Sequence, residues 1–466
     1  MRSIPPRGPL VAFSILCAVG LGSVAFVWAL GSTSPAHAQV PNLPVVERRL
    51  DNGLRVLVQR DRRSSRVGVA LQYHVGFRTT PQGFRGLPHI VEHLMYTGSE
   101  HAPEGAAAYF EPAGGTGMNG MTGQDATTYY VELPARELDL ALWIESDRMA
   151  YLITALDEAK VARERSVVLQ EWRERVSGRA SGWLTETVQA AMYPEGHPYR
   201  LLGDDPEHVA SIRLAHVQWF LQQFYVPDNA TLAIVGDVDP DRAITSVQRY
   251  FGSIPRSRAP VPVPQPAVVR LDASRFVEFE APTYTDTVML VWPTPPYLEA
   301  DDATLDVLAK LLDRRLESMV TGPLRSAGAA QASHQLASEF SIVLNMEPGT
   351  DPRPYVAAVD GYLAQLQQNT LRAGTLPAYL EDATNWITRG YEGYDDRAMS
   401  LALSPEGHVV SPHFLASRYA TLGADDVRRV ANTWLPIDRR LVVHVRSVPD
   451  APMGGRVAPL RVGGLQ

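Results

Sequence analysis

The sequence predicts an α+β protein made of two similar domains, and three observations support this prediction. Segments with the two-residue alternation of strands and segments with helical periodicity occur in both halves of the chain. A proline-rich run at 255–268 separates the halves. A weak internal repeat aligns 224–232 with 433–441, so that Pro227 matches Pro436. One hydrophobic core is too small for a chain of this length, and two domains that share a fold account for it.

The first 38 residues are expected to be a signal peptide. Arg2 and Arg7 precede an apolar run over 9–31, and Ala36-His37-Ala38 supplies a cleavage site before Gln39. The mature protein would then begin near Gln39 and be exported, which makes it periplasmic. The alternative is an uncleaved membrane anchor over 9–31, because this run is long enough to cross a bilayer.

Composition restricts the class of function. Cys17 is the only cysteine of the chain and lies in the signal segment, so the mature protein has no thiol. This suits an oxidising compartment and excludes thiolate metal sites and cysteine catalysis. The formal net charge is −8, and removal of residues 1–38 takes away two arginines and no acid. Such an acidic chain is not expected to bind nucleic acid.

The first domain, 39–254, begins with an expected hairpin over 45–58. Asp51-Asn52-Gly53 is a strong tight-turn signal between two runs that contain apolar residues. The remaining elements follow from hydrophobic periodicity. They are strands at 67–75, 127–133 and 230–235, helices at 138–152 and 158–176, and a glycine-rich loop at 114–117.

The second domain, 269–466, follows the linker. The prolines of 255–268 exclude a regular helix or a central strand and favour a stiff, extended connection. Beyond it the pattern starts again, with expected strands at 275–279 and 287–291 and a helix at 301–318.

The most informative stretch runs from Gly86 to Met95 and contains the pattern H-x-x-E-H. A proline near its start and the apolar residues after it indicate a helix. On that helix His89 and His93 project from one face and can reach a single ion. Glu92 lies beside them, where a carboxylate can take a proton from an attacking water. The alternative is a helix that carries two histidines by chance, since one short pattern is weak support.

A hydrolytic zinc site needs a third protein ligand. Three acids of one predicted helix qualify, namely Glu164, Glu171 and Glu174, which lie on nearly the same face. Valines share part of this face, so it is expected to point inward, and a buried acid needs a partner such as a cation. The alternative is that these acids are solvated charges on a helix rich in arginine and glutamate.

The second domain lacks the motif. Its helix at 301–318 should correspond to the motif helix but contains no histidine. Only the first domain is therefore expected to bind metal in this way, and the second is expected to shape the substrate site or to support the first.

Together these features resemble the pitrilysin and insulinase class of inverted-motif zinc peptidases, and most of all its half-length branch, which includes mitochondrial processing peptidase and its bacterial relatives. The resemblance extends over most of the mature chain. It rests on the following matches: H-x-x-E-H with Glu164-Arg165-x-Val167-Val168-x-x-Glu171, Gly114-Gly115 with Asn119, Thr127-Thr128-Tyr129-Tyr130, Gly196-His197-Pro198 with Gly203, and Tyr225-x-Pro227-x-Asn229-Ala230 with Val235-Gly236-Asp237.

The resemblance implies a role for each motif residue. His89, His93 and Glu171 would be the ligands of Zn²⁺, and Glu92 would be the general base. Glu164 matches a second acidic position that would orient or tune a ligand.

Substrate binding is implied in the same way. Asn119 matches the family's position on a strand that pairs with extended substrate, although Gly120 stands where the family usually has alanine. The implied fold is two domains that face each other across a cleft, each a mostly antiparallel sheet with helices packed on one side. The implied activity is that of a zinc-dependent metalloendopeptidase acting on short or unfolded peptides.

The second domain departs from the family pattern at one point. The family has an arginine and, seven residues later, a tyrosine that hold the substrate or its tetrahedral intermediate. Arg325 matches the arginine, but Gln331 or Ala332 stands where the tyrosine is expected. A second half-length chain is therefore expected to supply these contacts in a two-subunit enzyme, a heterodimer. The alternatives are a homodimer or monomer with other donors, and a drifted site in an assembly subunit.

A non-catalytic interpretation also stays open. The chain would then be a periplasmic assembly or binding subunit with a structural zinc. Structural sites usually have four protein ligands, and the fourth would come from His74, His101 or His197.

Overall fold

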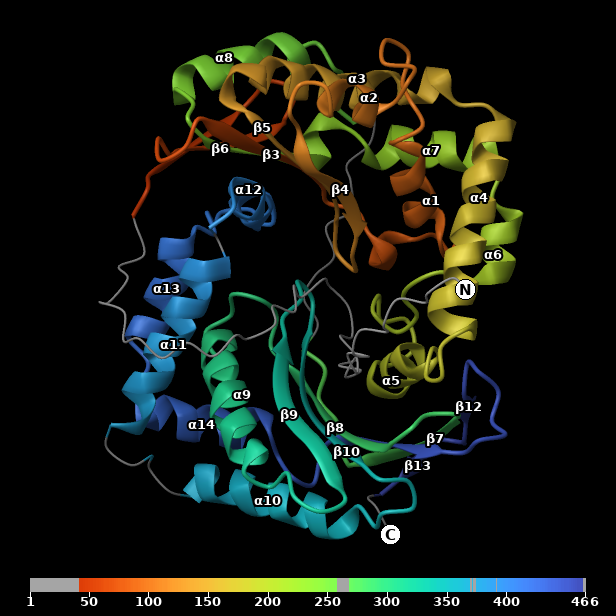
Figure 1. Cartoon of the computed structure of the whole chain (residues 1–466), viewed down its shortest axis with the longest axis vertical. Coiled ribbons are helices and arrows are strands. Elements are labelled where there is room, and N and C mark those ends of the chain that lie inside the picture. Colours follow the sequence, from red (N-terminus) through yellow and green to blue (C-terminus); the bar gives the residue numbers. More distant parts are fainter. Residues whose placement is uncertain (1–41, 258–267, 369–370, 372–373, 391, 464–466) are drawn as a thin grey trace, which may run out of the picture.

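The computed structural model describes residues 42–257, 268–368, 371, 374–390 and 392–463 (Figure 1). The expected signal peptide, with its apolar run, and most of the proline-rich linker lie outside these residues. Among the helices in the described ranges, none combines the length and the apolar composition needed to cross a bilayer.

The first unit is a six-stranded sheet in the order β1-β2-β6-β3-β5-β4. Its strands are β1 (Val45–Arg49), β2 (Arg55–Arg60), β3 (Arg66–Tyr73), β4 (Thr116–Thr122), β5 (Thr127–Pro134) and β6 (Ala230–Gly236). The predicted hairpin is formed by β1 and β2. Only the pair of β2 and β6 is parallel, and β4 lies at the edge.

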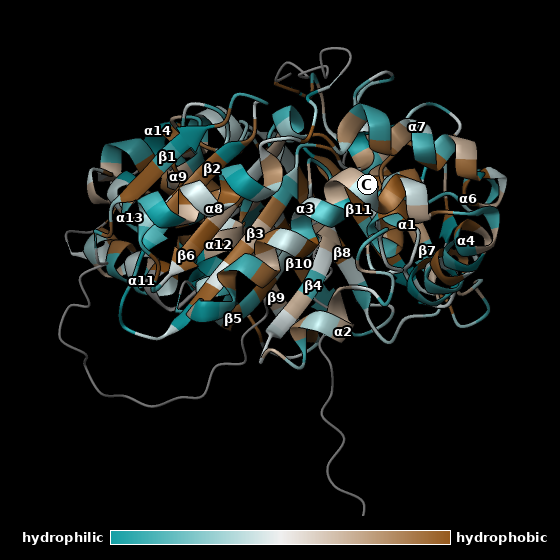
Figure 2. Cartoon of the chain, turned by 90° about the horizontal axis from the view of Figure 1, so that it is seen from above, coloured by the Kyte–Doolittle hydropathy of each residue, from teal (hydrophilic) through white to brown (hydrophobic). Residues whose placement is uncertain are grey.

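The first half of the sequence also forms helices, which lie in this unit except for one that packs on the second sheet. They are α1 (Leu87–Leu94), α2 (Ala106–Phe110), α3 (Leu138–Ala155), α4 (Glu158–Trp172), α5 (Leu184–Met192), α6 (Pro206–Ser211), α7 (Leu214–Phe224) and α8 (Pro240–Phe251). Aspartates begin three of them: the side chain of Asp157 accepts a hydrogen bond from the Lys160 backbone, that of Asp205 from the Glu207 and His208 backbones, and that of Asp239 from the Arg242 backbone. Figure 2 shows hydrophobic residues along β3 and β6 and hydrophilic residues on outer helices such as α4.

The second unit is built on a sheet in the order β12-β7-β11-β8-β10-β9, and β13 also pairs with β7. Its strands are β7 (Arg275–Ala281), β8 (Asp286–Thr294), β9 (Leu324–Ala332), β10 (Ser338–Met346), β11 (Leu441–Ser447), β12 (Arg456–Val457) and β13 (Arg461–Val462). Its helices are α9 (Asp302–Glu317), α10 (Arg353–Gln368), α11 (Thr375–Gly390), α12 (Tyr394–Ala402), α13 (Pro412–Ala420) and α14 (Ala424–Trp434).

The two sheets have the same topology. The path β2-β6-β3-β5-β4 of the first corresponds to β7-β11-β8-β10-β9 of the second, and the one parallel pair falls at the same place in both. The predicted α+β fold with two similar, mostly antiparallel units is therefore confirmed. Figure 1 shows the two units facing each other, with α1 and β4 on one side and β9 on the other.

The halves exchange one helix each. Helix α12 comes from the second half of the sequence but packs on β3 and β6 of the first sheet. The approach is so close that a Cβ added at Gly68 would lie 2.3 Å from the Tyr394 carbonyl carbon. Helix α5 comes from the first half and packs on β7 and β11. Each sheet thus has a helix of the other half on its second face.

A buried ion pair holds this exchange in place. Arg397 of α12 lies 2.7 Å from Asp61, which follows β2, and both side chains are almost fully buried. Arg55 of β2 donates to the backbone carbonyls of Ser404, Pro405 and His408 beyond α12. Breaking such a pair would leave a buried charge without a partner, so the two halves are firmly interlocked.

Candidate metal centre

Helix α1 begins at a residue that has to be glycine. Gly86 has φ of 100°, and a Cβ at this position would lie 2.3 Å from Cγ2 of Val209. Pro88 then fits the first turn. Ile90, Val91 and Leu94 are buried in the core, so the opposite face of the short helix is fixed toward α4.

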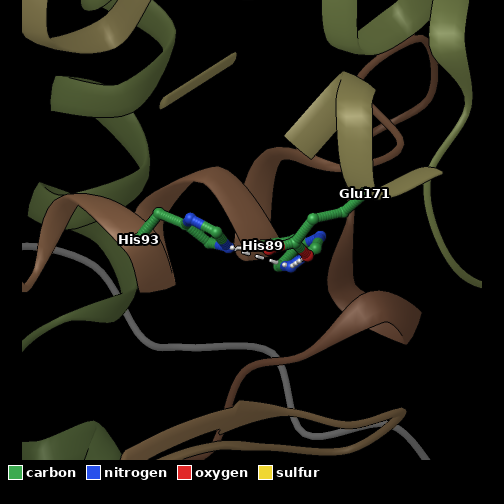
Figure 3. Close-up of side chains that lie close together, drawn as sticks. All are labelled: His89, His93 and Glu171. Atoms are coloured by element: carbon green, nitrogen blue, oxygen red, sulfur yellow. Dashed lines mark hydrogen bonds and ion pairs between the residues drawn. The ribbon is translucent and has the colours of Figure 1, made fainter. Parts of the chain in front are cut away.

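Three side chains meet on that face (Figure 3). Nε2 of His89 and Nε2 of His93 lie 3.2 Å apart. Glu171 of α4 reaches both rings, with Oε2 at 3.5 Å from His89 Nε2 and Oε1 at 3.6 Å from His93 Nε2. The ligand atoms of the three residues all lie within 4.8 Å of one another. Within the described part of the chain, no other group of three such residues meets this criterion.

The donor set fits zinc. Two imidazoles and one carboxylate are the usual protein ligands of catalytic zinc and leave one position open for water. The two Nε2 atoms point at each other, an arrangement in which two lone pairs repel unless a proton or a cation lies between them. A shared cation therefore explains both the ring orientations and the nearby carboxylate.

Electrostatics favour a positive charge at this place. Burial alone would lower the pKa of His89, but the carboxylates of Asp204 and Glu171 raise it to about 10. The hydrogen bond with His89 in turn lowers the pKa of Glu171 to about 2, and Arg175 adds to this shift. A divalent cation would supply the positive charge that these carboxylates favour.

Two more acids contact the histidines from behind. Oδ2 of Asp204 lies 2.9 Å from Nδ1 of His89, which fixes the ring and directs Nε2 toward the other ligands. Oε2 of Glu164 lies 3.5 Å from Nδ1 of His93, while its Oε1 accepts a hydrogen bond from Arg163. Asp204 and Glu164 thus occupy equivalent places behind the two rings.

Glu92 is held by a contact from the sheet. Its Oε2 accepts a hydrogen bond of 2.5 Å from the hydroxyl of Thr122, the last residue of β4. The charge of Glu92 contributes to the raised pKa of His89, so its carboxylate lies near the cluster without belonging to it.

The other predicted residues lie farther from the cluster. Asn119 is exposed on the edge strand β4 and accepts a hydrogen bond from Gly120 N with its own side chain. Arg325 lies on β9, where it forms an exposed ion pair with Glu347. Six residues on, Gln331 exchanges hydrogen bonds with Thr294 at 3.0 and 3.2 Å. A strand rises about 3.3 Å per residue, so Arg325 and Gln331 are about 20 Å apart.

The alternative ligands are engaged elsewhere. Glu174 accepts a hydrogen bond from Gln170 and is exposed. His74 contacts Thr231, His101 contacts Asp147, and His197 stacks on Tyr193. None of these three histidines belongs to the metal-binding group found among the described residues.

Sequence reasoning missed two residues of the site, Thr122 and Asp204. Thr122 reaches Glu92 only because the β4–β5 hairpin folds back beside α1, and no spacing in the sequence announces that contact. Asp204 follows Gly203, which is one of the residues that carry the family resemblance. That match draws attention to the segment, but it does not indicate that the Asp204 carboxylate contacts His89.

Two family profiles match the chain. The profile described as "Insulinase (Peptidase family M16)" matches residues 55–205, which contain the three clustered side chains. The profile described as "Peptidase M16 inactive domain" matches 211–376.

Named relatives agree with these profiles. The chain is 26% identical to "Zinc protease PqqE" of Helicobacter pylori over 79% of its own length and 83% of the relative. It is 23% identical to "Probable zinc protease PqqL" of Escherichia coli, and the match spans 77% of this chain but only 40% of that protein. The beta subunit of the mitochondrial-processing peptidase of Saccharomyces cerevisiae is 25% identical over 66% of each chain.

Solved structures show the same fold. A protease from Helicobacter pylori has a TM-score of 0.78 at 22% identity and covers 87% of this chain and 100% of its own. The periplasmic protease PqqL from Escherichia coli has a TM-score of 0.70 at 19% identity and covers 89% of this chain and 48% of its own. The relatives are named zinc proteases, and the donor set formed by His89, His93 and Glu171 fits that metal. The chain therefore belongs to the M16 family of insulinase-type peptidases.

Proposed function

We propose that this protein is an exported zinc metallopeptidase that hydrolyses short or unfolded peptides. In this proposal His89, His93 and Glu171 hold Zn²⁺, and Glu92 is the general base. The observation that carries it is the convergence of these three side chains next to a fourth, catalytically suitable carboxylate. A structural zinc has no need of such a carboxylate beside it.

The chemistry follows from where the side chains lie. Bound zinc supplies Lewis acidity, which lowers the pKa of a water and polarises a carbonyl. Glu92 takes a proton from the attacking water on Oε1, because Oε2 accepts the Thr122 hydroxyl. Glu92 then passes this proton to the nitrogen of the departing amine. Asp204 keeps the His89 ring in one orientation throughout.

Strand β4 is the proposed docking place for the substrate backbone. It pairs with β5 on one side only and is the last strand of its sheet in the described structure. An edge strand offers unpaired backbone groups to an extended peptide, and Asn119 lies on this edge. Recognition through the backbone selects for unfolded segments more than for a particular side chain.

A second half-length chain is the proposed partner. Arg325 is paired with Glu347, and no tyrosine occupies the 331–332 positions, so this chain has an incomplete set of the expected substrate contacts. One relative is named as a subunit, and the chain spans 48% of the periplasmic protease PqqL. These facts favour a two-subunit enzyme in the periplasm.

A non-catalytic assembly or binding subunit is the second candidate. The match of the inactive-domain profile to 211–376 favours it. That match, however, falls on the half that lacks His89, His93 and Glu171.

Two experiments test the proposal. The Glu92→Gln variant should bind zinc as the parent does but hydrolyse a mixture of unstructured peptides at least a hundredfold more slowly. Equal rates of cleavage would contradict the peptidase assignment. Adding a similar half-length chain encoded by a neighbouring gene should raise activity if the partner supplies the missing contacts. Full activity of the isolated chain would contradict the two-subunit arrangement.

A further inference from the structure

The hydrogen bond between Thr122 and Glu92 joins the motif helix to the end of β4. An ionised carboxylate only accepts hydrogen bonds, so the hydroxyl of Thr122 donates to Oε2. Thr122 pairs with Thr127 of β5, and the Thr127 hydroxyl donates to the Val75 carbonyl at 2.9 Å. The position of Glu92 therefore depends on how the β4–β5 hairpin is held.

The turn of this hairpin, residues 123–126, is anchored on the motif side by the segment before α1. The carbonyl of Gly123 accepts a hydrogen bond from Phe77 N, and that of Gln124 accepts one from Arg78 N. The contact is close, because a Cβ added at Gly76 would lie 2.4 Å from the Gly123 oxygen. The turn therefore has little freedom on this side.

The same turn is anchored to the second half through Asp125. Its Oδ1 lies 2.7 Å from Arg78 Nε and accepts a hydrogen bond of 2.5 Å from the Tyr199 hydroxyl. Its Oδ2 accepts a hydrogen bond from the backbone of Gln335, which follows β9. The Tyr199 oxygen also accepts from the backbone of Leu336 at 3.0 Å. Asp125 is buried, so these contacts are shielded from water.

We propose that Thr122 is a positioning residue for Glu92, and that the Asp125–Tyr199 joint transmits the position of the zinc-free second half to Glu92 through β4. This inference rests on the proposed function of the same site. It gives the second half a task inside the chain, in addition to any contact with a partner subunit. It also explains why a buried carboxylate and a tyrosine hydroxyl meet two backbone amides of the other half.

The first test separates positioning by Thr122 from simple packing. Thr122→Val keeps the shape but removes the hydroxyl, and it should lower kcat at least tenfold while KM and zinc content stay within twofold of the parent. Thr122→Ser restores the hydroxyl and should bring kcat to within threefold of the parent. A Thr122→Val enzyme with parental kcat, or no recovery in Thr122→Ser, would overturn the role of Thr122.

The second test compares two buried tyrosines that both bridge the halves. The Tyr193 hydroxyl donates to Glu339 Oε1 at 2.9 Å, whereas the Tyr199 hydroxyl donates to Asp125 of the turn. Tyr199→Phe should lower kcat at least threefold and raise amide hydrogen exchange in 116–126 at least fivefold. Tyr193→Phe should leave kcat and exchange in this segment within a factor of two. Equal effects of the two variants would overturn the coupling through Asp125.

Hydrogen exchange keeps this inference distinct from the proposed function. If the parent chain binds zinc and cleaves no peptide, with or without a partner chain, the proposed function has failed. The exchange difference between Tyr199→Phe and Tyr193→Phe still decides whether the second half holds β4. If the parent is active but the two variants exchange alike, the coupling alone has failed.

Discussion

Helix α1 of the first half carries His89 and His93 four residues apart, whereas α9 of the second half carries Asp302 and Asp306 at the same spacing. Both helices follow the same strand of their sheets, β3 in one and β8 in the other. Both contact the edge strand of their unit, β4 or β9. The comparison shows how corresponding helices of two similar units use two polar side chains that lie four residues apart.

The partners of the two pairs differ in charge. In the second half α13 supplies a cation, with Nη1 of Arg418 at 3.0 Å from Oδ2 of Asp302. Arg418 is only 13% exposed, and the neighbouring Tyr419 hydroxyl donates to Asp306. Burial and the nearby Asp302 raise the pKa of Asp306 to about 7.

In the first half the charges around the histidines are carboxylates. Their arginine partners, Arg163 and Arg175, lie at the surface with side chains 61% and 56% exposed. The acids on α9 therefore have a buried arginine as partner, whereas the carboxylates around the histidines pair only with exposed arginines. This difference adds to the absence of histidine from α9, on which the expectation of a single zinc site rests.

The largest expected effect comes from a substitution in the metal-binding cluster of the first half. Glu171→Gln removes the charged ligand and should reduce zinc content well below one ion per chain and peptide hydrolysis by at least a thousandfold. Asp306→Asn, on the corresponding helix of the second half, should keep the zinc content of the parent. Atomic emission on purified chains measures the metal, and zinc loss in Asp306→Asn would contradict the division of roles.

The next largest effect is a loss of stability, caused by removing the buried arginine of the second half. Arg418→Met leaves Asp302 buried without its cation and should lower the free energy of unfolding by about 3–5 kcal/mol. Arg429→Met is the matched control, because Arg429 pairs with the adjacent Asp301 but is 54% exposed. Its loss should change stability by about 1 kcal/mol or less. Urea unfolding measures both free energies. Equal effects of the two substitutions would show that Arg418 is not needed to balance the charge of the buried Asp302.

The next prediction concerns the pH dependence of stability, at a contact between the two halves. Burial raises the pKa of Glu339 from its usual 4.5 to about 7, even though the Tyr193 hydroxyl donates to it. Below pH 4.5 the group is neutral in both the folded and the unfolded state, so its stabilising contribution is fully present. As the pH rises through 7, ionisation of Glu339 stabilises the unfolded chain more than the folded one. The free energy of unfolding then falls by up to about 3 kcal/mol.

The measurement is the stability of parent and Glu339→Gln at pH 5 and pH 8. The variant should be more stable relative to the parent at pH 8 than at pH 5, since a neutral amide does not titrate. A constant difference between the two proteins across this range would contradict the raised pKa.

Local signals explain what the sequence could predict. The H-x-x-E-H helix, the Asp51-Asn52-Gly53 hairpin and most strands lie where expected, because each depends on residues close together in the chain. The strand β4 was partly missed, since 114–117 was expected to be a loop and the strand begins at Thr116. Its sequence of glycine and small polar residues has no alternation, and pairing with β5 creates the strand.

Long-range contacts explain what it could not predict. Nothing in the sequence of α12 indicates that it packs on the sheet of the first half rather than on its own. The sequence predicts a helix from 158 to 176, but α4 ends at Trp172, and a π-helical turn, Arg173–Ser177, follows directly. The contacts of Thr122 and Asp204 likewise depend on tertiary structure, so they appear only in three dimensions.

The smallest expected effect compares the two edge strands. A Cβ at Gly120 of β4 would lie 2.7 Å from the hydroxyl of the half-buried Tyr96 and 3.2 Å from Cδ1 of the buried Tyr129. Gly120→Ala, the residue usual in the family, should therefore destabilise the protein by about 1–2 kcal/mol. At Gly328 of β9 the nearest atom is Asp313 Oδ1 at 3.2 Å, the end of a side chain that can move.

Gly328→Ala should accordingly change stability by about 0.5 kcal/mol or less. Removing the obstructing hydroxyl tests the cause, because Tyr96→Phe should recover at least half of the loss in the Gly120→Ala background. Thermal unfolding of the four proteins measures this. If Gly120→Ala does not change the stability, β4 has space for a methyl group at this position. It is then packed no more tightly than β9. If it is destabilising and rescued, the close packing that keeps Thr122 against Glu92 is a property of the first half alone.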